Sequence, residues 1–392
     1  MTERERPAAP SSGLGLAALT WAHFLNDGYI NYLPAVLPVL LTKFHMRIAL
    51  VGSLILALLG IGSLLQPFLG WKADRTGGRS FVLAGLVLSA LGTSLIGLAP
   101  GYWPLIALLI IAGLGNAAFH PQALAAARSI TEARAGTAMS FFLIGGELGR
   151  GLWPVLAGFL VVSLGLRSLW LFAIPGVLTM LLLLRSVPHL APVPSRLARD
   201  SWQRNRGRIL ALVGFVGLRG MVTYGVVTFV PLLWHARGGS LVAGASLISA
   251  MLVVGILGNF SGGILADHVG RRPVIISSSI LSSVLLALFL FSNGIWLWVS
   301  LAFLGIATFA TAPVTMLIGQ DLFPKSHSMA SGITLGAGNT LGALAIFVLG
   351  FVANSYGIDA AMWCIAGLSL LGLPLALMLP EKLSRPSAVP EP

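Results

Sequence analysis

Apolar segments long enough to cross a lipid bilayer recur along the whole chain of 392 residues. A membrane-spanning helix needs about 20 mostly apolar residues to cross roughly 30 Å of hydrocarbon. Only 9% of the residues are charged, against about 25% in soluble domains. The pattern predicts an all-α membrane protein. Its twelve expected transmembrane helices span residues 14–41, 48–70, 80–99, 103–127, 136–164, 167–186, 208–235, 242–266, 272–292, 295–319, 328–354 and 359–379.

Basic residues set the expected orientation of these helices. A net charge of +12 would suggest nucleic acid as the partner of a soluble protein. Here the basic side chains lie in short loops between apolar segments, so the expected partner is the lipid bilayer and not nucleic acid. With both chain ends in the cytoplasm, that side carries 18 Lys and Arg residues and the other side carries four. This excess predicts cytoplasmic termini, because Lys and Arg gather on the cytoplasmic side of membrane proteins.

The two halves of the chain repeat one another. An offset of 193 residues pairs Pro38 with Pro231, and an offset of 192 pairs Pro121 with Pro313. The repeat predicts two pseudo-symmetric six-helix bundles with a binding site near the midplane between them. The expected organisation is a cytoplasmic tail (1–13), an N-terminal bundle (14–186), a cytoplasmic linker (187–207), a C-terminal bundle (208–379) and a second cytoplasmic tail (380–392).

One loop motif occurs in both halves at this offset. An Asp at the membrane edge can accept hydrogen bonds from the free amides of a helix N-terminus, the glycines allow close helix approach, and the arginines anchor the loop at the interface. We therefore expect both loops to act in gating. Their candidate residues are Gly70, Asp74, Arg75 and Arg79 in the first half and Gly263, Asp267, Arg271 and Arg272 in the second.

The doubled loop resembles the signature of the major facilitator superfamily. Further motifs resemble its fosmidomycin-resistance family: His23-Phe24-Leu25-Asn26-Asp27, Phe119-His120-Pro121, Gly145-Gly146-x-x-Gly149 and Asp321-Leu322-Phe323-Pro324. The resemblance implies the major facilitator fold and a monomeric exporter in the bacterial inner membrane, which exchanges small compounds such as a phosphonate antibiotic for protons. The chain departs from the family pattern at Glu147, where Asn is expected, and at Trp153-Pro154, where Gly-Pro is expected.

Four formally charged residues fall well inside the predicted helices: Asp27, Glu147, Arg150 and Arg219. At about 1.5 Å per residue, each lies near the midplane of the membrane, where a charge is costly unless it is paired or faces water. Glu147 and Arg150, three residues apart, form either a structural ion pair or part of the substrate site. Arg219 matches Asn26 in the repeat, so we expect it to face Asn26 and Asp27 and to bind an anion or to pair with Asp27.

Two histidines accompany these charges. His23 and Asp27 lie four residues apart on one helix face, and both titrate in a useful range, so they are the proton-coupling candidates together with Glu147; the alternative is a hydrogen-bonded packing pair. His120 precedes Pro121 and is expected to pack or gate rather than to bind substrate. The further polar candidates for the substrate cavity are Asn26, Tyr29, Tyr32, Gln66, Asn116, Tyr224, Asn259 and Asn339.

These observations favour a secondary transporter. The leading hypothesis is a proton-coupled antiporter that exports a small, anionic or zwitterionic organic compound. The alternatives are uptake or exchange of an organic anion without proton antiport, and metal-ion transport through His23, Asp27 and His120, which the nearby Arg219 opposes. The chain has no enzyme motif that would predict catalysis and none that predicts a cofactor. Its single cysteine, Cys364, excludes a disulfide within the chain and a cysteine-based metal site.

Overall fold

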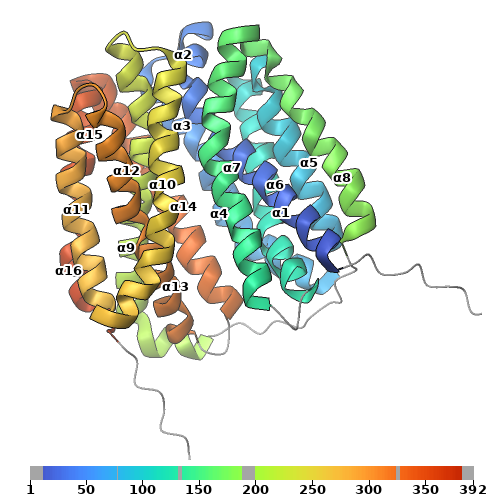
Figure 1. Cartoon of the computed structure of the whole chain (residues 1–392), viewed down its shortest axis with the longest axis vertical. Coiled ribbons are helices and arrows are strands. Elements are labelled where there is room, and N and C mark those ends of the chain that lie inside the picture. Colours follow the sequence, from blue (N-terminus) through green and yellow to red (C-terminus); the bar gives the residue numbers. More distant parts are fainter. Residues whose placement is uncertain (1–11, 77, 131–134, 188–198, 324–326, 382–392) are drawn as a thin grey trace, which may run out of the picture.

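The structure, a computed structural model, describes residues 12–76, 78–130, 135–187, 199–323 and 327–381. All regular elements in these ranges are helices, and no strand occurs among them. The helices stand roughly side by side as two groups, one from each half of the chain (Figure 1). The predicted all-α architecture is therefore confirmed.

The N-terminal half begins with a helix in two parts. In chain order its elements are α1 (Ser12–Asn31), α2 (Leu33–Lys43), the 3-10 turn η1 (Ile48–Leu50), α3 (Val51–Ile55), the π-helical turn η2 (Leu56–Gly60), α4 (Ile61–Thr76), α5 (Arg79–Ser94), η3 (Leu95–Leu98), α6 (Tyr102–Ile130), α7 (Ala135–Leu164), η5 (Leu166–Phe172) and α8 (Ala173–Ser186).

The C-terminal half repeats this order, with breaks at Ala310 and at residues 370–371. Its elements are α9 (Arg199–Ala236), α10 (Leu241–Val269), α11 (Arg271–Phe291), α12 (Trp296–Phe309), α13 (Thr311–Leu322), α14 (His327–Tyr356), α15 (Ile358–Ser369) and α16 (Gly372–Met378).

The first predicted span, 14–41, is not one continuous helix. It is divided at Tyr32 into α1 and α2. Pro34 stands in the first turn of α2, where the missing N–H costs no hydrogen bond. In the middle of a continuous helix it would leave a carbonyl of the preceding turn without a donor. The predicted linker also differs: 188–198 lie outside the described residues, and 199–207 is helical, with non-helical backbone only at Asn205.

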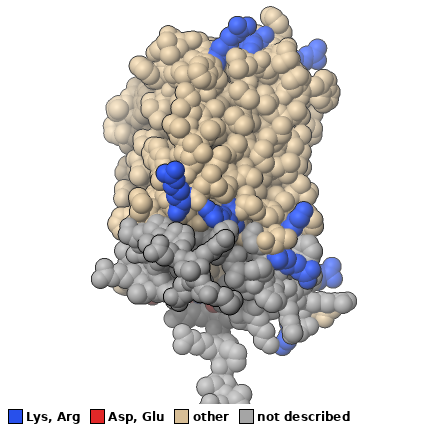
Figure 2. Space-filling model, turned by 90° about the vertical axis from the view of Figure 1, so that its right-hand side faces the viewer, with Lys and Arg blue, Asp and Glu red and all other residues tan. Residues whose placement is uncertain are grey.

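Eleven segments of the described chain are long and apolar enough to span a membrane. Together with α1 and α2 they account for the twelve predicted spans. Lys and Arg gather toward the two ends of the face drawn in Figure 2, with a broad uncharged band between them. This band has the character expected of a surface in contact with lipid tails.

Several helix contacts join the halves, including those of α2 with α9 and α10. The helix α7 packs on α10, and α14 packs on α3, η2 and α4. A Cβ atom on Gly52 would lie 2.4 Å from the Cα of Phe347, and one on Gly151 would lie 2.5 Å from Val253. Small residues therefore set how closely the halves approach, as is usual between membrane helices.

Candidate functional site

Asp27 is the centre of a charged cluster built from α1, α6 and α7. Its Oδ1 lies 2.9 Å from His120 Nε2, and its Oδ2 lies 3.6 Å from His23 Nε2 and 3.3 Å from Arg150 Nη2. Asp27 is only 3% exposed. The carboxylate is thus removed from water but surrounded by three cationic or proton-bearing groups, which is the arrangement a buried charge needs.

Both histidines are fixed through their other ring nitrogen. His23 Nδ1 lies 2.8 Å from the carbonyl oxygen of Phe142, and His120 Nδ1 lies 3.1 Å from that of Asn116. A carbonyl can only accept, so each Nδ1 carries a proton. A Cβ on residue 146 would lie 2.4 Å from the His23 ring, so Gly146 makes room for it.

The hydrogen bond from His120 Nδ1 to a carbonyl limits how protons can be shared between His120 and Asp27. His120 can donate through Nε2 to an ionised Asp27 only as the doubly protonated imidazolium, since its Nδ1 proton is already used. The alternative is a neutral imidazole that accepts the proton of a carboxylic acid. In either case the His120–Asp27 pair holds one dissociable proton.

A second carboxylate extends the cluster toward the other half. Glu147 Oε1 and Oε2 both lie 3.4 Å from Arg150 Nη1, and Asn259 Nδ2 on α10 donates to Glu147 Oε1 at 3.4 Å. The predicted contact between Glu147 and Arg150 is therefore present. Asn259 belongs to the C-terminal half, so this contact crosses the interface between the bundles.

The cluster has a partly exposed outer part and a buried inner part. The side chains of Arg150, His120 and Glu147 are 31%, 28% and 21% exposed, whereas those of His23 and Asp27 are 6% and 4% exposed. A molecule that approached from the exposed side would meet the three outer groups before Asp27. The outer groups are thus the candidates for contact with cargo, and Asp27 is the candidate for holding the proton.

The structure brings His120 into contact with Asp27. The sequence predicts a packing or gating residue at this position, and the contact with Asp27 is the shortest ion pair of the cluster. The hydrogen bond from His120 to the carbonyl of Asn116 carries no specific sequence signal, since every residue inside a helix has a carbonyl four residues earlier. The partner on α1 leaves no mark in the sequence.

Arg219 lies within electrostatic range of Glu147 and Arg150, so it is near the cluster, but it forms no ion pair with Asp27. Asp27 pairs with Arg150 instead, and Asn26 donates from Nδ2 to Asn116 Oδ1 at 2.8 Å. None of the ion pairs in the described part of the chain includes Arg219. It lines a small cavity inside the C-terminal bundle.

Three of the other predicted polar residues donate hydrogen bonds within their own bundle. Tyr29 donates to the carbonyl of Phe172 at 2.7 Å, and Tyr32 donates to that of Thr93 at 2.6 Å; both rings are fully buried. The structure therefore does not bring Tyr29 and Tyr32 to the cluster. Tyr224 donates to Asn339 Oδ1 at 2.6 Å. Gln66 is half-buried on α4.

The loop motif of the C-terminal half is described more completely than that of the N-terminal half. Arg271 donates to Asp321 at 2.6 Å, and Arg272 donates to the carbonyl of Leu379 at 3.1 Å. Asp267 is exposed and forms no hydrogen bond with a described residue, so the expected cap on a helix terminus is not seen there. In the first loop, Gly70 and the exposed Arg75 lie at the end of α4, Arg79 donates to the carbonyl of Leu184, and the side chain of Asp74 is outside the described part.

Three residues of the cluster are of the types that bind metal ions. One ligand atom each from His23, Asp27 and His120 lies within 4.8 Å of the others. Histidines that donate Nδ1 to a carbonyl are typical of metal sites. Arg150, however, places a fixed positive charge 3.3 Å from Asp27 Oδ2, which opposes a divalent cation at that position.

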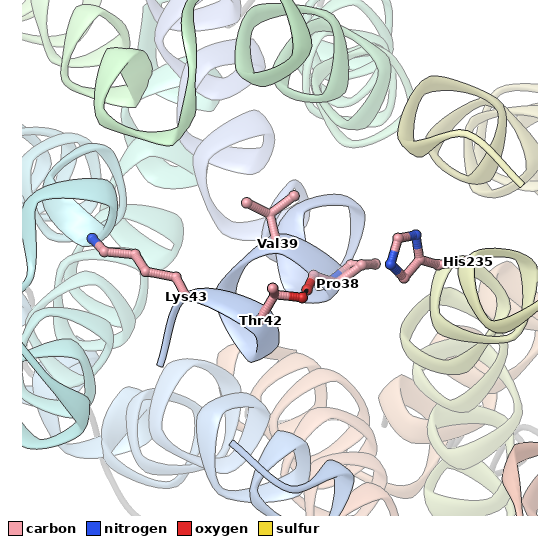
Figure 3. A pocket seen from close by; sticks show the side chains of 5 residues that line it. All are labelled: Pro38, Val39, Thr42, Lys43 and His235. Carbon is pink, nitrogen blue, oxygen red and sulfur yellow. Dashed lines mark hydrogen bonds between the residues drawn. The ribbon is translucent and has the colours of Figure 1, made fainter. Parts of the chain in front are cut away.

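The larger cavity lies away from the cluster. It has a volume of about 290 Å³ and is lined by Pro38, Val39, Thr42 and Lys43 of α2 and by His235 of α9 (Figure 3). Lys43 extends away from it and donates to the carbonyl of Gly97 at 2.8 Å. Desolvation and the neighbouring Arg167 lower the pKa of Lys43. The cavity separates the first and seventh predicted spans at one end of the molecule.

Comparisons with known proteins agree with this architecture. The family model of the Major Facilitator Superfamily matches residues 19–262 and 218–392. The MFS-type transporter YfnC of Bacillus subtilis is 26% identical over 372 residues, covering 92% of this chain and 91% of the relative. The fosmidomycin resistance protein of Escherichia coli K12 is 26% identical over 391 residues, covering 93% and 92%.

Solved structures show the same fold at lower identity. The nucleoside transporter NupG superposes with a TM-score of 0.78 at 17% identity, covering 94% of this chain and 99% of that one. A bacterial homologue of the lysosomal transporter Spinster, in an inward-facing and occupied conformation, gives 0.72 at 17% identity, covering 95% and 94%. The two-bundle helical fold and the match of a family model to both halves place this chain, a multi-pass membrane protein, among the secondary transporters of the major facilitator superfamily.

Proposed function

We propose that this transporter exports a small organic compound, anionic or zwitterionic, in exchange for protons. The observation that carries the proposal is the His120–Asp27 pair, which holds a dissociable proton beside Arg150 in a partly exposed cluster. Asp27, His23 and Glu147 are the proton-coupling groups. Arg150 and Arg219, with the neighbouring Asn26 and Tyr224, supply positive charge and hydrogen bonds for the cargo. The bundles would rock around this site in alternating access, in a bacterial inner membrane with both chain ends cytoplasmic.

The charge balance of the cluster supports a negatively charged group on the cargo. Two carboxylates, Asp27 and Glu147, face two guanidinium groups, Arg150 and Arg219. The proton on the His120–Asp27 pair leaves one positive charge over. A carboxylate or phosphonate group would balance it and fits the planar fork of an Arg side chain.

Antiport adds a second requirement. The proton and the cargo must weaken each other's binding. At this site a proton neutralises Asp27 or Glu147, and only a cationic group of the cargo competes for the same carboxylates. A zwitterion meets both requirements, because its anionic group binds an Arg and its cationic group displaces the proton. Zwitterionic compounds are therefore better suited than purely anionic compounds to exchange for protons at this site.

A purely anionic cargo would couple to protons with the opposite sign. Protonation of Asp27 releases Arg150 from its carboxylate, and the more positive cluster then binds an anion more tightly. This favours a second candidate function for such cargo, namely uptake or exchange of an organic anion without proton antiport.

The test measures the direction of proton movement. Purified protein is reconstituted in liposomes that contain a pH-sensitive dye, and a compound is added outside without a pH gradient. We expect a zwitterion such as 2-aminoethylphosphonate to make the interior more alkaline, because its entry drives protons out. Fosmidomycin, named by one relative, and methylphosphonate are added as anionic compounds, and protein-free liposomes report leakage.

Two matched variants complete this test. Asp27→Asn should abolish the proton movement, whereas Asp359→Asn, which removes only an exposed surface pair with Arg237, should leave it unchanged. Full wild-type proton movement in the Asp27→Asn protein would overturn the proposal. Acidification by methylphosphonate alone would favour the second candidate function.

A further inference from the structure

A small cavity inside the C-terminal bundle has a mostly apolar wall that also includes hydroxyl groups and Arg219. It has a volume of about 20 Å³, which exceeds the space of about 10–15 Å³ that one bound water needs. Its walls come from α9, α11, α12, α15 and α16. The lining residues are Phe215, Leu218, Arg219, Val222, Ser278, Ser279, Ser282, Thr308, Ser369 and Gly372.

Arg219 contributes an unsatisfied donor to this cavity. Its Nε atom is buried and has no hydrogen-bond partner among the described residues. Leaving a buried N–H of a charged group without an acceptor is costly, and most such groups in proteins bond to protein or to ordered water. The guanidinium therefore needs an acceptor at this point.

The N-terminal half shows how the same space is filled when no cavity exists. At the offset of 193 residues, Val222 corresponds to Tyr29 and Gly225 to Tyr32. The two tyrosine rings are fully buried and their hydroxyls bond to carbonyls of the bundle. In the C-terminal half Val222 is smaller than a tyrosine and lines the cavity, whereas Ile365 occupies the space beside Gly225.

The hydroxyl groups decide what kind of molecule fits. Ser278, Ser279 and Ser369 donate their protons to backbone carbonyls at 2.6, 3.0 and 2.7 Å. Each keeps lone pairs that only accept. Ser282 and Thr308 bond to each other at 3.2 Å, which leaves one of the two hydroxyl protons to donate. A guest therefore meets both donors and acceptors, and three serine oxygens that only accept. Water can satisfy both kinds of group, whereas a halide or carboxylate oxygen cannot donate to the three serines.

We propose that this cavity is a water-binding site that completes the hydrogen bonds of Arg219. One water accepts from Arg219 and donates to the serine oxygens. A water molecule exchanges readily, whereas a carboxylate partner would fix the guanidinium in place. The charged Arg219 thus stays available to a second, anionic ligand. This role in ligand binding rests on the proposed function, whereas the hydration of the cavity does not.

Hydroxyl-radical footprinting by X-ray irradiation tests the hydration, because bound water generates radicals next to buried side chains. Phe215 lines the cavity and is 4% exposed, and Phe229 lies on the same helix and is 0% exposed. In the full-length protein we expect Phe215 to be modified severalfold faster than Phe229. Equal rates would overturn the proposal, and so would a bromide ion bound beside Arg219 in a crystal soaked with bromide.

Two variants at Val222 provide the matched pair. Val222→Phe fills the cavity and should reduce modification of Phe215 to the rate of Phe229, while Val222→Ala enlarges it and should keep the fast rate. If Val222→Phe does not fold, Val222→Leu serves the same purpose. Fast modification of Phe215 in a protein that moves no protons would support the water site and overturn the proposed function, so the two failures are distinct.

Discussion

The two bundles share one scaffold but carry different chemistry. In the N-terminal half, His23, Asp27 and His120 meet Arg150 in one cluster. At the repeat offsets of 192 and 193, the C-terminal counterparts of His23, Asp27, His120, Glu147 and Arg150 are Val216, Gly220, Ala312, Asn339 and Gly342. Only one of these five can form a side-chain hydrogen bond.

The contrast shows that the repeated fold does not require the charges. Gly220, the counterpart of Asp27, lies against α14: a Cβ there would be 2.2 Å from the carbonyl oxygen of Gly338. The position that holds a proton-bearing group in one half is thus a close helix contact in the other. The C-terminal half keeps a single intramembrane cation, Arg219, among the residues that the structure describes there.

Transferring the acid to the C-terminal half should have the largest effect. Gly220→Asp would force a side chain into the backbone of α14 and bury a new carboxylate, so we expect loss of the folded protein. The measurement is the monodisperse fraction in size-exclusion chromatography. Gly207→Asp on the same helix, where a Cβ meets no atom within 4 Å, should fold like the wild type. Equal yields for both variants would show that the halves are interchangeable here.

Removing the cation of the N-terminal cluster comes next. Arg150→Gln leaves Asp27 and Glu147 facing each other without a shared guanidinium, and hydrogen bonds to charged groups contribute about 1.5–3 kcal/mol. We expect a lower melting temperature and loss of proton exchange. Arg237→Gln breaks a surface pair worth about 0–1 kcal/mol and is the control. A melting temperature equal to that of the control would mean that Arg150 does not stabilise the cluster.

The two histidines should differ in their pH dependence. The imidazolium of His120 is stabilised by Asp27 in the folded protein, so its contribution is present at low pH and is lost as the pH rises through the range of about 5 to 8 in which histidine titrates. The wild-type melting temperature should fall over that range. His120→Asn should flatten the curve more than His23→Asn, because its contact is 2.9 Å rather than 3.6 Å. The opposite order would assign the proton to His23.

The smallest effect is expected in the C-terminal half. Tyr224→Phe removes the hydrogen bond to Asn339, a loss of about 1 kcal/mol, and no charge. We expect a slightly lower melting temperature with the direction of proton movement unchanged, measured in the same dye-filled liposomes. A reversal of that direction would place coupling chemistry in both bundles.

Much of the fold could be predicted because long apolar segments fix it. Residues 242–266 were expected to be a helix, and α10 runs from Leu241 to Val269. Hydropathy averages over many residues, however, so it does not detect a local break such as that at Tyr32. That break depends on Pro34, one residue among many apolar ones.

The site could be predicted only along single helices. The contacts of His23 with Asp27 and of Glu147 with Arg150 follow from spacings of four and three residues, and both are present; their roles remain predictions. Contacts between helices were not accessible in this way. His120 reaches Asp27 because α6 packs beside α1, and Arg219 comes within electrostatic range of Glu147 only through the contact between the two halves.

The five ionisable side chains of the cluster all belong to one bundle, and among the described residues Asn259 hydrogen-bonds to them from the other bundle. This separation bears on how such a protein can evolve. Mutations in the second half can change which solutes are accepted while the acid, its two imidazoles and its arginine keep their mutual geometry. Duplication followed by such divergence would let one half preserve the energy source while the other explores new cargo.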